Sequence, residues 1–140
     1  MEPKPDWEFF PHLGDVGIRG FGLTKHAAFE NAARAMTATI TDPASVTANV
    51  DIEIECRAAD DDTLLVDWLN ALVFDMAVRG MLFRDFRVTL GNGQLTALAR
   101  GEPIDLDRHA PRVEVKGATY TCLRVTREGE RWLAQCVLDV

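Results

Sequence analysis

The sequence is poor in positive charge. Fifteen lysine and arginine residues stand against 22 acidic residues, which gives a formal net charge of −7, and no basic run interrupts this balance. Because nucleic-acid-binding proteins neutralise phosphates with basic patches, the composition disfavours direct, strong binding of RNA or DNA. Any link to a nucleic acid would pass through a protein partner or a bound cation.

Long apolar segments are also missing. Asp67, Asn70 and Asp75 break the most apolar stretch, residues 64–78, so it falls short of the ~18 apolar residues of a membrane span. The first ten residues have neither the basic start nor the apolar core of a signal peptide. We therefore expect a cytoplasmic protein without membrane segments, folded as a single domain over residues 1–140.

Cysteine is scarce, and known catalytic signatures are absent. Cys56, Cys122 and Cys136 are odd in number and show no C-x-x-C spacing, which disfavours a disulfide framework and a zinc site. Each stands where an apolar residue would fit a strand, so we expect three buried free thiols. The sequence has no nucleophile elbow, Walker loop, G-x-G-x-x-G or H-E-x-x-H motif.

The apolar pattern predicts two helices. Thr24 is a plausible N-cap for a helix that ends before Pro43. A second helix spans residues 59–80, where an acidic start favours the helix dipole and Gly80 provides the stop.

The remaining chain reads mainly as strands. Alternation over residues 50–56 predicts a half-buried strand, and two short strands precede the first helix. Residues 86–100 and 112–140 read as two hairpins, separated by the polar loop 101–111. The sequence thus predicts an α+β fold of two layers, a largely antiparallel β-sheet with both amphipathic helices on one face.

The segment HLGDVGIRG, residues 12–20, is unusual for a strand because three glycines interrupt it. Interior glycine packs nothing and loses entropy on folding, so we expect something to approach this backbone closely. His12 and Asp15 begin the segment. Asp15 either caps local amides in a turn or takes part in a functional site.

Three further positions stand out. Asp139 shares the predicted face of the last strand with Gln135 and Val137, and Val140 adds main-chain oxygens beside it. Such oxygen donors suit Ca²⁺ or Mg²⁺, although a solvated aspartate at a frayed end is the alternative. Lys116 lies in a predicted strand next to Gly117, and a plain surface lysine is equally compatible with the sequence. The loop at 101–111 is either functional or merely solvated.

Six stretches, taken together and in order, resemble the archease family. They are HLGDVGIRGFG, AFENAARAM, LLVDWLNALVF, GE…D…RH, VEVKGATY and a final W-x-A-Q-x-x-x-D-V. The resemblance covers nearly the whole chain. Where most relatives have Thr-Ala between the histidine and the aspartate, this chain has Leu13 and Gly14.

The resemblance implies a small α+β protein that activates an RtcB-type RNA ligase, which uses GTP and Mn²⁺ in tRNA splicing and RNA repair. Such a protein is not itself an enzyme. It promotes guanylylation of the ligase histidine and multiple turnover. By resemblance, Asp15, Asp139 and a carbonyl of Val140 bind a divalent cation, typically Ca²⁺, with Mg²⁺ or Mn²⁺ as alternatives. Lys116 falls on the essential lysine of the family, and His12 on its N-terminal motif.

Other functions remain open at this point. A chaperone-like protein that modulates client solubility would bind exposed apolar surface and would not need Asp139. A metal-dependent hydrolase would need a water-activating base, which the sequence does not supply. A purely structural subunit would depend on none of these residues.

Overall fold

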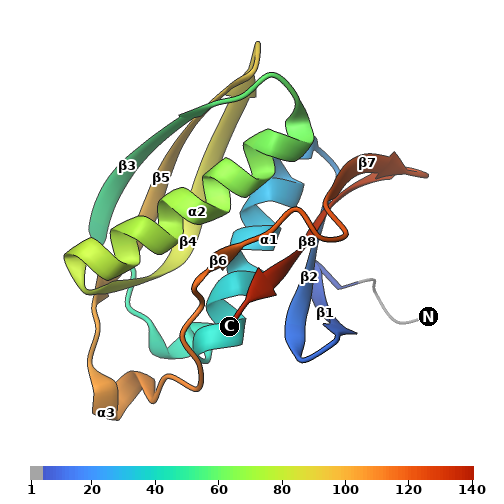
Figure 1. Ribbon diagram of the computed structural model, residues 1–140. Helices are drawn as coiled ribbons and strands as arrows, with labels where there is room; N and C mark the ends of the chain where they lie inside the picture. The colour runs from blue at the N-terminus through green and yellow to red at the C-terminus, as the bar shows by residue number, and fades with distance from the viewer. Residues whose placement is uncertain (1–4) are drawn as a thin grey trace.

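The computed structural model describes residues 5–140 and confirms the α+β class (Figure 1). The strands divide into two antiparallel sheets. The five-stranded sheet has the order β1 (Trp7–His12), β2 (Asp15–Gly22), β8 (Arg131–Asp139) and β6 (Gly117–Ala118), and β7 (Arg124–Glu128) also pairs with β8. The three-stranded sheet has the order β3 (Val50–Arg57), β5 (Gln94–Pro103) and β4 (Met81–Gly91).

Both long helices begin and end close to the predicted positions. Helix α1 (Lys25–Ile40) is capped by Thr24, whose hydroxyl accepts a hydrogen bond from the Ala27 N–H at 3.2 Å. Helix α2 (Asp61–Arg79) is capped by Asp60 and ends at Gly80, with φ of 61°. Such caps satisfy the free amides and carbonyls at helix ends, and their signals are local in sequence.

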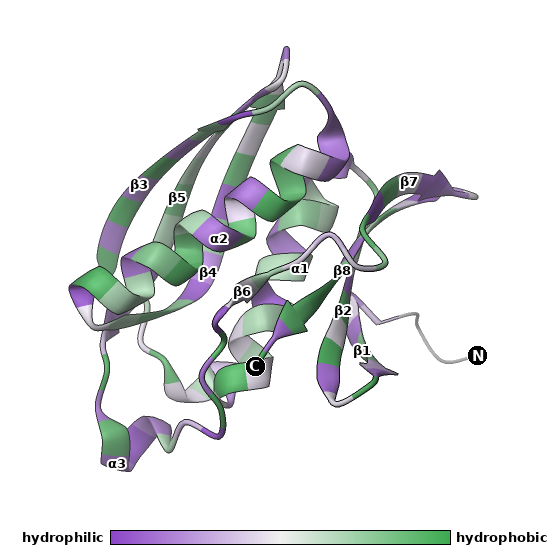
Figure 2. Ribbon diagram, in the orientation of Figure 1, coloured by the Kyte–Doolittle hydropathy of each residue, from purple (hydrophilic) through white to green (hydrophobic). Residues whose placement is uncertain are grey.

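The core joins both sheets through the helices. Helix α1 packs against β2 and β8 of one sheet and β4 of the other. The Trp68 indole N–H donates to the Phe29 carbonyl at 3.1 Å and so ties α2 to α1. Strand β3 alternates apolar and polar residues along its length (Figure 2), and it packs against α2. Within residues 5–140, no helix is long and apolar enough to cross a membrane.

The segment between the two hairpins differs from the prediction. Strand β5 continues to Pro103, and the expected loop contains the short helix α3 (Leu106–His109). The predicted strand from residue 112 does not form, because only Gly117 and Ala118 pair with β8. Lys116 therefore precedes a strand instead of lying in one. The 3₁₀ turn η1 (Pro43–Ser45) follows α1, and the final hairpin turns at Gly129 as predicted.

The glycines of β2 serve the interior, and the close approach that we expected comes from within the chain and not from a ligand or partner. A Cβ at Gly17 would lie 2.4 Å from the ring of Phe10, its neighbour across the hairpin. A Cβ at Gly20 would lie 2.2 Å from the backbone nitrogen of Ala32. The close approach is made by this chain's own aromatic ring and helix α1.

The three cysteines are free, but only one is fully buried. Cys136 is buried, Cys56 is half-buried and Cys122 is exposed, which corrects the expectation of three buried thiols. Burial raises the pKa of Cys56 to about 11 and that of Cys136 to about 12. Both are therefore neutral thiols at physiological pH and poor nucleophiles.

Candidate functional site

The hairpin between β1 and β2 places His12 directly opposite Asp15. Its two-residue turn has positive φ at both positions, 45° at Leu13 and 89° at Gly14. Two successive positive φ angles fit the type I′ geometry that matches strand twist in tight hairpins. Gly14 adopts this conformation without strain, whereas Leu13 does so while almost fully exposed.

The register of the five-stranded sheet brings the two ends of the chain together. Val16 on β2 pairs with Leu138 on β8, so Asp15 stands opposite Asp139 when the register is continued by one residue. On the other side of β8, Asp139 pairs with Gly117 of β6. Directly opposed residues project to the same face of a sheet. Asp15 and Asp139 thus lie side by side at one end of the sheet.

This arrangement places two like charges next to each other. Asp139 is exposed and Asp15 half-buried, and opposed like charges across a strand pair destabilise a sheet. Within residues 5–140, neither carboxylate forms an ion pair with a lysine, arginine or histidine. The oxygens of the two aspartates and of the Val140 main chain are the donors that hard divalent cations select.

Histidine 12 does not complete a three-side-chain metal site. Among the described residues, no group of three His, Cys, Asp or Glu side chains is placed to hold a metal ion. A cation at this end of the sheet would therefore rest on the two aspartates and main-chain oxygen. Because Ca²⁺ takes six to eight oxygens, about half of its positions would be left to water or to a partner.

Lys116 lies beside Asp139, on the side of β8 opposite to Asp15. Its N–H donates to the Asp139 carbonyl at 2.8 Å. Its side chain is exposed and lines a largely apolar groove of about 590 Å³ between α2 and residues 111–116. We call the end of the sheet formed by His12, Asp15, Lys116, Asp139 and Val140 the acidic tip.

A buried polar network holds the segment that leads to Lys116. Arg108 donates two hydrogen bonds to the buried Glu102 carboxylate, at 2.8 and 2.6 Å, and the Thr47 N–H donates a third. Arg108 and the Thr47 amide hold the pKa of Glu102 far below its ordinary value. Glu102 and Arg108 lie in the GE…D…RH stretch, which the sequence alone allowed to be either a functional loop or a solvated one. The structure gives the stretch an anchoring role.

His109 belongs to the same network and has one defined tautomer. Its Nδ1 accepts a hydrogen bond from the Asp105 N–H at 2.9 Å, so the proton lies on Nε2, which donates to Glu102 at 3.0 Å. The His109 carbonyl accepts from the Thr41 hydroxyl at the end of α1. Sequence reasoning missed this ring as a buried donor, because a polar stretch does not show that the helical turn of α3 folds the ring back onto Asp105 and Glu102.

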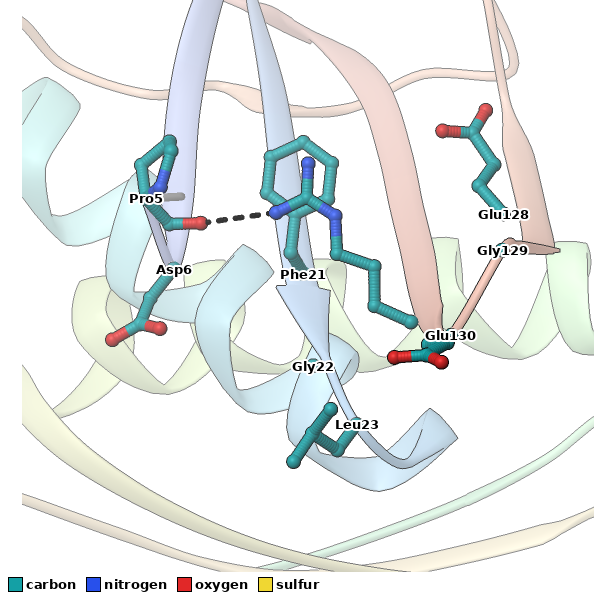
Figure 3. Close-up of a pocket in the computed structure, with 9 residues that line it drawn as sticks. Pro5, Asp6, Phe21, Gly22, Leu23, Glu128, Gly129 and Glu130 are labelled. Atoms are coloured by element: carbon teal, nitrogen blue, oxygen red, sulfur yellow. Dashed lines mark hydrogen bonds between the residues drawn. The ribbon is translucent and has the colours of Figure 1, made fainter. Parts of the chain in front are cut away.

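A different cavity, of about 570 Å³, opens at the far end of the same sheet, where β2 ends and β8 begins (Figure 3). The Arg131 guanidinium lies 3.8 Å from the centre of the Phe21 ring and donates to the Pro5 carbonyl at 3.5 Å. None of the predicted site residues lines it. The candidate functional site is therefore at the acidic tip and not in this cavity.

The fold and the site together define a class: small α+β proteins whose second and last strands meet at an acidic end of one sheet. Residues 7–140 match the family described as the Archease protein family (MTH1598/TM1083). The chain is 36% identical over 139 residues to protein archease of Pyrococcus furiosus, covering 96% of this chain and 98% of the relative. It is 38% identical over 138 residues to that of Methanopyrus kandleri, covering 96% and 99%. The chain belongs to the archease family.

Solved structures agree with this assignment. The solution structure of Methanobacterium thermoautotrophicum protein 1598 has a TM-score of 0.85 at 33% identity, covering 96% of this chain and 99% of its own. The crystal structure of a Thermotoga maritima archease, described as a possible chaperone, has a TM-score of 0.63 at 15% identity, covering 100% and 98%. The second likeness concerns the fold alone.

Proposed function

We propose that this protein is a cytoplasmic, non-catalytic activator of an RtcB-type RNA ligase, promoting guanylylation of the ligase histidine and multiple turnover in tRNA splicing or RNA repair. Membership of the archease family supports the proposal. The observation that carries it is the acidic tip. Asp15 and Asp139 come from opposite ends of the sequence, yet the sheet register sets them side by side with Lys116 adjacent.

The residues of the acidic tip have distinct roles in this proposal. Asp15, Asp139 and a main-chain oxygen of Val140 hold a divalent cation, which we take to be Ca²⁺, with Mg²⁺ and Mn²⁺ as alternatives. When bound, that cation supplies positive charge beside the phosphates gathered during guanylylation. The backbone of Lys116 lies next to Asp139, and its exposed ammonium group, which forms no ion pair with residues 5–140, engages a phosphate or an acidic group of the ligase. His12 orders the hairpin opposite Asp15.

The test is single-turnover guanylylation of the cognate ligase with and without this protein. We expect Asp139→Asn, which keeps the side-chain shape, to reduce the stimulation by about tenfold or more, as loss of one electrostatic contributor does. Lys116→Gln should reduce it as well. Glu53→Gln is the matched control, because Glu53 is an exposed carboxylate on the other sheet.

Substitution is a sharper test than chelation, because a chelator would also remove the Mn²⁺ of the ligase. Full stimulation by folded Asp15→Asn, Asp139→Asn and Lys116→Gln proteins would reject the role of the acidic tip. Absence of stimulation by the wild-type protein would reject the function itself. The purified protein alone should turn over neither nucleotide nor RNA.

One observation favours a chaperone-like activity as a second candidate. Helix α2 exposes Phe74 and Val78, at 65% and 66% of their surface. Exposed apolar groups of this kind can hold unfolded clients, and their action would not need Asp139. Suppression of aggregation of an unrelated client by the Asp139→Asn protein, lost in Phe74→Ser, would support this candidate.

A further inference from the structure

Residues 112–116 form an extended segment between α3 and β6 that pairs with no strand of the described residues 5–140 (Figure 1). Their sequence, RVEVK, alternates as a strand does. Neither a turn nor a bend interrupts residues 111–116, yet pairing with β8 begins only at Gly117. A segment with a strand sequence and a drawn-out backbone therefore stands unpaired next to the acidic tip.

The backbone of this segment is bonded only at its two ends. The Arg112 N–H donates to the Ile40 carbonyl and the Lys116 N–H to the Asp139 carbonyl, both at 2.8 Å. Between them, the N–H and C=O groups of Val113, Glu114 and Val115 bond to no other group of residues 5–140. Alternate residues of an extended chain direct their amides to the same edge. Since the amides of Arg112 and Lys116 point toward the protein, the amides of Val113 and Val115 point to the opposite, outer edge.

The segment is held in place before any partner arrives. Val115 is 5% exposed and belongs to the core, and the Arg112 guanidinium donates to the Ala38 carbonyl of α1. A fixed row of unpaired amides and carbonyls is a template for another strand. Little ordering entropy would be lost on this side of the contact.

Apolar pockets flank the segment on both sides. The groove of about 590 Å³ on the α2 side is lined by apolar side chains, which are Val73, Met76, Ala77, Met81, Leu82 and Ile104. A second pocket, of about 460 Å³, lies between the segment and β1, with Phe9 and Phe10 in its wall. Arg112 and Val113 border both. An added strand would find a place for apolar side chains next to its backbone bonds.

Charge disfavours a second copy of this chain in two pairings, one antiparallel and centred on Glu114 and one parallel and in register. In an antiparallel self-pair centred on Glu114, Arg112 would face Lys116 of the copy and Glu114 would face Glu114. In a parallel in-register pair, each charge would face its own kind. Like charges directly opposed are unfavourable. Within residues 5–140, neither Arg112 nor Lys116 forms an ion pair, so both charges are open to an acidic partner.

We infer that residues 112–116 are a docking edge that takes up one extended segment of the partner ligase, with acidic residues opposite Arg112 and Lys116 and apolar residues opposite Val113 and Val115. This inference rests on the proposed function for the identity of the partner. Because Lys116 is both the end of the docking edge and part of the acidic tip, the added strand would bring the tip to the ligase in a fixed orientation.

Hydrogen exchange of the wild-type protein tests the docking edge without any variant. The amides of Val113, Glu114 and Val115 should exchange rapidly in the free protein. In the complex with the ligase, exchange at Val113 and Val115 should slow by about tenfold or more, because strand pairing protects amides. Unchanged exchange at both amides in a formed complex would overturn the inference. Protection of these amides in the free protein, together with a dimer in sedimentation, would overturn it in favour of self-pairing.

A pair of variants separates the backbone contribution from the side chain. Val113→Pro removes an amide that is unbonded in the free protein and suits an extended chain, whereas Val113→Ala keeps the amide. We expect Val113→Pro to weaken ligase binding in calorimetry by about tenfold or more and Val113→Ala to leave it within about twofold, at matched thermal stability.

The outcomes for the two proposals are distinct. Wild-type affinity of the Val113→Pro protein would overturn the docking edge and leave the proposed function standing. A wild-type protein that neither binds nor stimulates the ligase would overturn both. Asp139→Asn should lose stimulation while retaining the exchange protection at Val113 and Val115, since docking and cation binding use different groups.

Discussion

Glu102 shows how one buried carboxylate can anchor the segment that leads to Lys116, a residue that it does not contact. It accepts hydrogen bonds from Arg108, Thr47 and His109. Arg108 also donates to the Ser45 carbonyl at 2.8 Å, so the network joins the end of β5, the turn after α1 and α3. The chain leaves this network toward Lys116, whose position therefore depends on it.

Glu102→Gln should destabilise the protein and change its response to acid. The pKa of Glu102 is lowered in the folded state, chiefly by the hydrogen bonds from Arg108. A lowered folded-state pKa contributes stability that is present above the ordinary carboxyl value of 4.5 and is lost as the pH falls below it. We expect a lower urea midpoint for Glu102→Gln at pH 7, and a smaller difference from wild type at a pH well below 4.5.

Urea unfolding of the wild-type and Glu102→Gln proteins, from pH 7 to well below pH 4.5, provides the measurement. Glu130→Gln is a suitable control, because Glu130 is an exposed turn residue. A constant gap between wild type and Glu102→Gln at every pH would contradict the role assigned to the charged form of Glu102.

At the scale of elements, the contact between β2 and α1 depends on the absence of a side chain at residue 20. A Cβ there would lie within 3 Å of the backbone of Ala28 and Ala32. Backbone atoms cannot rotate away, so Gly20→Ala should force the strand and the helix apart. We expect a loss of about 3 kcal/mol, at the upper end of overpacking effects.

Gly91→Ala is the matched control for this substitution. Gly91 also lies in a strand, but open space surrounds its Cβ position. The unfolding free energy of the Gly91→Ala protein should stay within about 0.5 kcal/mol of wild type, as for ordinary surface changes. Equal stability of the Gly20→Ala and Gly91→Ala proteins in urea unfolding would show that the close packing of β2 on α1 is not required.

The same elements show which parts of the fold the sequence could predict. Helix caps such as Thr24 and Asp60 act within three residues, so the ends of α1 and α2 were predictable. Strand register depends on partners far apart in the chain, and neither the division into two sheets nor the short β6 could be read from alternation. Residues 112–115 carry a strand pattern, but no neighbouring strand reaches them.

The candidate site, like the fold, could be predicted from the sequence only in part. The sequence pattern singled out Asp15, Asp139, Val140 and Lys116 with alternatives left open, and the resemblance to archeases favoured the functional alternative. The register of β2, β8 and β6 sets these positions side by side. The purpose of the glycines was misread, because alternation cannot show that Phe10 and α1 occupy the space. The burial of Cys122 was predicted wrongly because the residue lies outside any strand, at a positive φ of 53°.

For the whole molecule, the acidic tip lies where the beginning and end of the chain are joined. Strand β8 is central, since it pairs with β2, β6 and β7, and β2 in turn holds β1 and packs on α1. A cation shared by Asp15 and Asp139 would bridge β2 and β8 and relieve the repulsion between two opposed carboxylates. Binding should therefore stabilise the entire fold and not only the hairpin.

We expect Ca²⁺ to raise the thermal midpoint of the wild-type protein, with a gain of about 2.7 kcal/mol at a free concentration of one hundred times its dissociation constant. Asp139→Asn should abolish this gain. Without Ca²⁺ it should be at least as stable as wild type, because it removes one of two like charges. Glu53→Gln should retain the full response.

Differential scanning calorimetry with and without Ca²⁺ measures all three proteins. An equal rise in Asp139→Asn and wild type would place the cation elsewhere, and wild-type protein without any rise would argue against a cation at the acidic tip of the free protein.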